Sequence, residues 1–216
     1  MKNIQKVKIY YIYFCQKNRD NLTFKYQKDL SLSMIDKSEF DTIRKELERL
    51  DKNREEAIQK SREIIRISKQ IIYALHRNDT KTAKELIKKI NSEKGLLEAR
   101  HFESDTDMPN VALQEYVEAV CYYNFITEGK LLRKKELNVS VDSYLGGLAD
   151  LTGELVRKAL DELINNKYEN AVIIKEIVDE IYGQFLKLDF RNSELRKKAD
   201  SIKWNLNKLQ EVIFEA

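Results

Sequence analysis

Residues 38–75, SEFDTIRKELERLDKNREEAIQKSREIIRISKQIIYAL, carry the pattern that decides the fold. Apolar residues return every three or four positions, which is the period of one face of an α-helix. These residues are Phe40, Ile43, Leu47, Leu50, Ala57, Ile64, Ile71 and Leu75. Ser38, with Asp41 three residues later, is a plausible helix start. We therefore predict one long amphipathic helix.

Similar patterns follow downstream. Asn78 and Asp79 break the long helix, and residues 103–110, which contain the only proline, are expected to form the main loop. Asp142 or Ser143 can cap a later helix. Further helices are expected over residues 80–90, 92–102, 111–132, 143–165, 168–188 and 193–214. The predicted fold is therefore all-α, a bundle of six or seven helices.

The composition agrees with one helical domain. Only 6 of 216 residues are glycine and 1 is proline, while 35% are charged, which favours long helices with solvated faces. Residues 1–33 are rich in tyrosine and lack a sustained helical period. We predict a poorly defined N-terminal extension over 1–33 and a single domain over 34–216. The extension is either upstream of a true start at Met34, or a loose arm, or a tyrosine-bearing segment that stacks on nucleobases.

Charge and cysteine content exclude several classes of protein. A net charge of +3, from 39 basic and 36 acidic residues, is too small to indicate a nucleic-acid-binding protein by itself. Cys15 and Cys121 are too far apart for a CxxC metal site and do not suggest a disulfide framework. No apolar stretch approaches the roughly 20 residues of a membrane-spanning helix. We predict a cytoplasmic protein without membrane contact.

Basic residues are concentrated in the second half of the long helix. Residues 39–56 mix both signs, whereas residues 57–78 contain the single acid Glu63. The basic residues of this half are Lys60, Arg62, Arg66, Lys69 and Arg77. Neutralisation of phosphates by Lys and Arg provides strong, salt-dependent affinity for nucleic acids. We predict that these five residues bind RNA, and the alternative is an ordinary solvated helix face.

Two pairs of acidic residues lie among apolar neighbours on later helices. Glu115 and Glu118 are three residues apart, and Asp150 and Glu154 are four apart, so each pair shares one helix face. If these helices pack antiparallel, the four carboxylates converge into the oxygen-rich site that Mg²⁺ or Mn²⁺ prefers. Such an ion activates water and stabilises charge on a phosphoryl group. Spacing alone also allows ordinary solvated faces.

Glycines and the single tryptophan are expected to reflect packing. Gly146, Gly147 and Gly153 lie inside a helical pattern, where each costs about 1 kcal/mol relative to alanine. Close approach of a neighbouring helix would compensate for this cost, and access for the backbone of a ligand is the alternative. Trp204 is expected in the core, together with the apolar residues of the last helix.

Two segments resemble the central motifs of the translin family. They are LQEYVEAV at residues 113–120 and YLGGLADLTGEL at residues 144–155, and both are most similar to the translin-associated factor X type. Further similar segments are KSREI at 60–64, LHR at 75–77 and LRKKADSIKWNLNKLQEV at 195–212. The resemblance covers about residues 39–215. It implies a seven-helix fold and a closed homo-oligomer, typically an octamer.

The resemblance also implies an activity. The factor X type carries an acidic set and cleaves RNA with a metal ion, whereas the translin type lacks the aspartate of the second motif and mainly binds nucleic acid. Glu115, Glu118, Asp150 and Glu154 match the acidic set, so the resemblance implies an endoribonuclease in which they hold Mg²⁺ or Mn²⁺ and act as catalytic residues. One alternative is a non-catalytic oligomer that binds RNA or single-stranded DNA. The other is a helical interaction protein that binds no nucleic acid.

Overall fold

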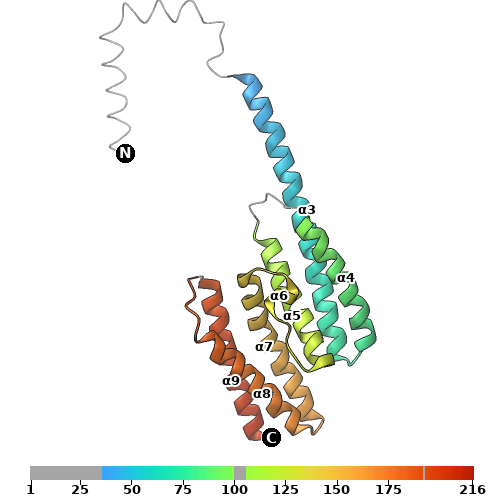
Figure 1. The fold of residues 1–216 in the computed structure, drawn as a ribbon, viewed down its shortest axis with the longest axis vertical. Coiled ribbons are helices and arrows are strands. Elements are labelled where there is room, and N and C mark those ends of the chain that lie inside the picture. Colours follow the sequence, from blue (N-terminus) through green and yellow to red (C-terminus); the bar gives the residue numbers. More distant parts are fainter. Residues whose placement is uncertain (1–35, 100–105, 192) are drawn as a thin grey trace, which may run out of the picture. The chain divides into compact units, whose positions relative to one another are not determined.

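The computed structural model describes residues 36–99, 106–191 and 193–216, and these contain seven α-helices and no strand (Figure 1). The helices are α3 (Lys37–His76), α4 (Thr80–Ala99), α5 (Met108–Glu128), α6 (Lys134–Leu137), α7 (Val141–Ile164), α8 (Tyr168–Phe185) and α9 (Ser193–Glu215). The all-α prediction is confirmed. None of the described helices is both long and apolar enough to cross a membrane.

The described residues fall into two units, residues 36–49 and Leu50–Ala216. The second unit contains the hydrophobic core. Six of the described helices contribute several buried or partly buried side chains to it, and the short helix α6 contributes Leu137. The predicted domain boundary after residue 33 lies outside the described residues, so that prediction stays untested.

The apolar face of α3 is covered over only part of its length. Ala57, Ile64, Ile71 and Leu75 are buried, as the helical period predicts. The earlier positions of the same pattern are exposed: Phe40 at 57%, Ile43 at 39% and Leu47 at 56%. The pattern therefore predicts the helix correctly, but within one chain part of its apolar face is not buried.

Several helix ends differ from the prediction because local hydrogen bonds decide them. Asp36, not Ser38, accepts at the start of α3, where its Oδ1 receives the Ser38 N–H at 2.9 Å. α7 is capped by Ser140, whose hydroxyl accepts the Ser143 N–H at 3.0 Å. The predicted helix over 111–132 ends at Glu128, because Gly129 takes a left-handed conformation with φ of 68°.

Two more expectations are corrected within the bundle. The helices expected over 80–90 and 92–102 are one continuous helix, α4, and Asn91 inside it accepts a hydrogen bond from the Tyr116 hydroxyl at 2.8 Å. Trp204 is 73% exposed, whereas Ile202 and Leu206 are buried. Residue 204 lies about 200° around the helix from residue 202, because each residue turns the helix by about 100°. The prediction of a core tryptophan was wrong.

α5 and α7 run parallel, not antiparallel. Ser143 at the start of α7 donates to Asn110 at the start of α5 at 2.8 Å, and further along Gly147 lies against Gln114. Both contacts join residues 33 positions apart, so the two helices advance in the same direction. The parallel arrangement arises because the segment containing α6 leads from the end of α5 back to the start of α7 (Figure 1).

Candidate functional site

Two glycines allow α5 and α7 to approach closely. A Cβ atom at Gly147 would lie 2.5 Å from the backbone oxygen of Gln114, and one at Gly146 would lie 2.5 Å from the Gln114 side-chain oxygen. The packing expectation is therefore confirmed for these two positions. At Gly153 a close helix contact does not explain the glycine, because a Cβ there would lie 3.8 Å from Asn205, an ordinary van der Waals distance.

The close approach places Asp150 and Glu154 of α7 within electrostatic range of Glu115 and Glu118 of α5, and we call these four residues the carboxylate cluster. Glu118 is 9% exposed, and burial, with the charges of the three other carboxylates Asp150, Glu115 and Glu154 added to it, raises its pKa to about 8. Burial also raises the pKa of Glu115, and the charges of Asp150 and Glu154 add to this effect. The charges of Asp150 and Glu154 therefore disfavour the ionisation of Glu115 and Glu118. Nearby positive charge offsets this repulsion.

Lys198 of α9 supplies one such positive charge. Its ammonium group forms an ion pair with Asp150 and also lies 3.5 Å from the backbone oxygen of Gly146. The two side chains of the ion pair are 25% and 34% exposed, so water reaches the pair. Lys69 of α3 adds a second charge, since it acts to lower the pKa of Glu115. The sequence analysis did not identify Lys198 as a site residue.

His76, the last residue of α3, connects α5 and α7 through its ring. Its Nε2 atom lies 2.5 Å from Glu154 Oε2, and its Nδ1 lies 3.3 Å from the hydroxyl of Tyr122. An ionised carboxylate only accepts hydrogen bonds, so a hydrogen bond of the ring to ionised Glu154 requires a proton on Nε2. Arg157 is also near Glu154, with 3.9 Å between their charged atoms. His76 was not predicted as a site residue, although it lies in the LHR segment.

The donor chemistry of the cluster suits a hard divalent cation, because all four predicted ligands are carboxylates. In the arrangement described, however, no three His, Cys, Asp or Glu side chains among residues 36–99, 106–191 and 193–216 are close enough to hold an ion. Asp150 and Glu154 instead contact Lys198 and His76. The carboxylates are therefore suitable ligands for a divalent metal ion. Asp150 and Glu154 would have to give up their contacts with Lys198 and His76 to bind it.

The predicted basic residues of α3 divide into two groups. Arg62, Arg66, Lys69 and Arg77 fall within a sector about 80° wide, opposite the buried face of the helix. We call these four residues the α3 stripe. Lys60 lies about 160° from Arg62 around the helix, and its ammonium pairs with Glu93 of α4 at 2.9 Å. The structure therefore places Lys60 apart from the other predicted RNA-binding residues.

Within the α3 stripe the charges differ in their availability. Arg66 pairs with Glu63 at 2.7 Å, whereas Arg62 and Lys69 are exposed and form no ion pair with a described residue. Lys69 is also within electrostatic range of Glu115. The α3 stripe thus borders the carboxylate cluster, since Lys69 acts on Glu115 and His76 of the same helix contacts Glu154.

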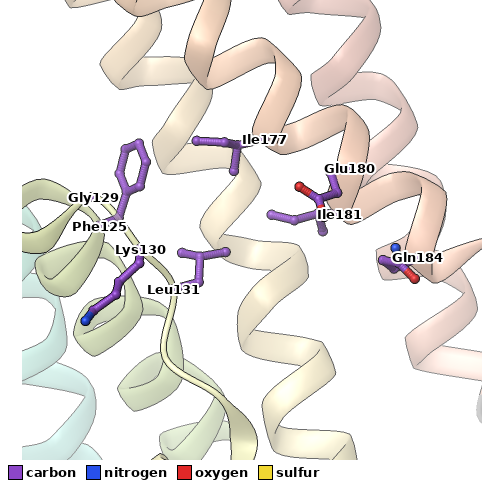
Figure 2. A pocket seen from close by; sticks show the side chains of 8 residues that line it. All are labelled: Phe125, Gly129, Lys130, Leu131, Ile177, Glu180, Ile181 and Gln184. Atoms are coloured by element: carbon purple, nitrogen blue, oxygen red, sulfur yellow. The ribbon is translucent and has the colours of Figure 1, made fainter.

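A pocket of about 320 Å³ lies elsewhere, between the end of α5 and α8 (Figure 2). Phe125, Leu131, Ile177 and Ile181 give it an apolar lining, with Lys130, Glu180 and Gln184 as its polar side chains. None of the four carboxylates and no residue of the α3 stripe lines it. The candidate chemistry is therefore on the helix surfaces of the cluster and not in this pocket.

Comparisons with known proteins agree with the arrangement. Residues 52–216 match the Translin family. The chain is 30% identical over 190 residues to an uncharacterized protein of Methanocaldococcus jannaschii, covering 83% of this chain and 82% of the relative. It is 25% identical over 232 residues to the mouse (Mus musculus) translin-associated protein X, covering 87% and 80%. The solved structure of a complex of AfC3PO with duplex RNA is similar with a TM-score of 0.75 and 28% identity, covering 82% of this chain and 95% of that one.

Proposed function

Because this chain belongs to the translin family, we propose that it binds RNA and cleaves it as an endoribonuclease that depends on Mg²⁺ or Mn²⁺. The observation that carries the proposal is the convergence of Glu115, Glu118, Asp150 and Glu154 across the contact of α5 with α7. The similarity to a protein whose structure contains duplex RNA supports the RNA-binding part. Single-stranded or short RNA is the expected substrate.

In this proposal the four carboxylates hold the ion. A bound Mg²⁺ or Mn²⁺ would supply an activated water and stabilise charge on the phosphoryl group. Lys198 and Lys69 are placed beside the carboxylates, so their ammonium groups can attract the phosphate of the substrate into an otherwise negative site. His76 orients Glu154 through its Nε2–H. No histidine or serine nucleophile is needed.

The second candidate function is RNA or single-stranded DNA binding without cleavage. The ion pair of Lys198 with Asp150 and the contact of His76 with Glu154 favour it, because the protein's own side chains occupy two of the four carboxylates. A nuclease assay on the purified chain, with Mg²⁺, with Mn²⁺ and with EDTA, separates the two functions. Metal-dependent cleavage supports the enzyme, and binding without cleavage supports the alternative.

RNA binding is expected to depend on the α3 stripe. Replacing Arg62 and Lys69 together with Gln should weaken binding to RNA of any sequence, because contacts with phosphate position a nucleic acid without reading its bases. The slope of log affinity against log salt should become shallower by about 1.4, since each phosphate contact with a single strand contributes about 0.7. Fluorescence anisotropy at several salt concentrations measures both effects.

Lys60→Gln is the matched control, because Lys60 lies on another side of α3 and is paired with Glu93. Its affinity and salt slope should stay close to those of the parent chain. Equal losses in the control and in the double variant would mean that binding follows net charge and not the α3 stripe. Repeating the titration with single-stranded DNA shows whether DNA is bound as well.

We further propose that the chain forms a homo-oligomer, with the octamer as the form that the family resemblance implies. The support is the exposed stripe of Phe40, Ile43 and Leu47, which follows the helical period and is not buried within one chain. Light scattering is expected to give a multiple of 25.5 kDa. Replacing Phe40 and Leu47 with Lys should lower that mass. A parent chain that stays monomeric at micromolar concentration would contradict the proposal.

A further inference from the structure

Tyr73 is an exposed aromatic residue within the sector of the α3 stripe. It follows Lys69 by one helical turn and precedes Arg77 by another, so its side chain leaves the same side of α3 as these two basic residues. The side chain is 57% exposed, and Tyr73 is not among the residues that pack against the hydrophobic core. Its ring therefore contributes little to the burial of apolar surface in this chain.

Arg77 holds the ring of Tyr73 in place. The guanidinium carbon of Arg77 lies 5.6 Å from the centre of the ring, and Arg77 Nη1 donates to the Tyr73 hydroxyl at 3.1 Å. These two contacts limit the rotation of an otherwise free side chain. A restrained aromatic ring loses less conformational entropy when a flat ligand stacks on it.

Tyr73 lies in α3 between two residues that interact with the carboxylate cluster. Lys69, four residues earlier, acts on Glu115, and His76, three residues later, contacts Glu154. A nucleic acid whose phosphates follow the α3 stripe toward the carboxylates would therefore pass the ring of Tyr73. Aromatic rings flanked by basic residues are the usual platform for the bases of single-stranded nucleic acids.

We propose that Tyr73 stacks on an unpaired base of bound RNA beside the carboxylate cluster, and this inference rests on the proposed RNA binding. The bases of a duplex are already stacked on their neighbours, so the ring selects for a single-stranded segment at the site. Stacking is tolerant of sequence, because every base has a flat face. Tyr73 thus determines the class of substrate, whereas Arg62 and Lys69 bind any polyanion.

The test compares two ligands of equal charge in EDTA, where metal-dependent cleavage is prevented. One is a short oligoadenylate, and the other is an abasic ribose-phosphate chain of the same length. Tyr73→Ala should weaken binding to oligoadenylate by about 10-fold or more, the effect of one lost stacking contact, and leave binding to the abasic chain unchanged. Tyr73→Phe should bind as the parent does, because the ring is kept. Tyr168→Ala, at a tyrosine of α8 that is 48% exposed, should have no effect.

The possible failures are distinguishable. Equal weakening on both ligands, or no weakening on either, would overturn the stacking role while RNA binding itself stands. A loss in Tyr73→Phe as large as in Tyr73→Ala would show that the hydroxyl acts through Arg77, which also overturns stacking. Equal binding of the parent chain to both ligands would show that bases contribute nothing. A parent chain that binds neither ligand would overturn the RNA-binding proposal together with this one.

Discussion

Asp150→Asn is expected to lower metal-dependent RNA cleavage by about 100-fold or more, because it removes one charged ligand of the ion without changing the size of the side chain. RNA affinity should be kept, since the proposed phosphate contacts lie mainly on the α3 stripe. Gel-based cleavage of single-stranded RNA and anisotropy in EDTA measure the two properties separately. Asp150 is the most informative of the four carboxylates to replace, because it is the one that pairs with Lys198.

Asp161→Asn provides the control on the same helix, because Asp161 is 44% exposed and pairs with Lys158 at 3.7 Å, away from the carboxylate cluster. It should cleave RNA as the parent does. A second readout does not depend on activity: Mn²⁺ should raise the melting temperature of the parent chain more than that of Asp150→Asn, since bound ligand stabilises the folded state. Cleavage that persists both in Asp150→Asn and in EDTA would rule out the carboxylate cluster as the active site.

Gly147→Ala is expected to destabilise the fold by at least about 2 kcal/mol, since overpacking of a tight contact costs about 1 to 3 kcal/mol and a helix offers no room to relax it. The added Cβ would lie 2.5 Å from the backbone oxygen of Gln114, and a backbone atom cannot move aside as a flexible side chain can. Separation of α5 from α7 would also pull the two acidic pairs apart. Cleavage should therefore fall together with the free energy of unfolding, which chemical denaturation measures.

Gly95→Ala is the matched control for this substitution. A Cβ at Gly95, inside α4, would meet no atom within 4 Å. The same change should there stabilise the chain by up to about 1 kcal/mol, because alanine has the higher helix propensity. Stabilisation in both variants would show that α5 and α7 do not depend on close contact at Gly147.

The fold could be predicted from the sequence because the helical period and the break at Asn78 are local properties. The acidic pairs could be recognised for the same reason, as spacing places each pair on one face. The relative direction of α5 and α7 could not be predicted from the sequence, because it depends on the route of the segment that connects them. Lys198 was missed because its pairing with Asp150 joins two helices 48 residues apart.

Two differences between the predictions and the structure could have been foreseen from the sequence. Lys60 and Arg62 are two residues apart, so they point to nearly opposite sides of a helix and cannot belong to one narrow stripe. The same reasoning applies to Trp204 and Ile202. The exposure of Phe40 was not avoidable in this way, because a periodic pattern shows which face is apolar but not what covers it.

The parallel pairing of α5 with α7 determines which changes in chain length this protein can accept during evolution. One residue inserted between Gly147 and Asp150 would turn Asp150 and Glu154 by about 100° around the axis of α7, away from the acids of α5. The connection between the two helices has no such constraint, since the contact of Gly147 with Gln114 sets the alignment whatever the length of that connection. Homologous chains that keep the acidic cluster should therefore vary in length between α5 and α7 and keep a constant spacing from Gly147 to Glu154.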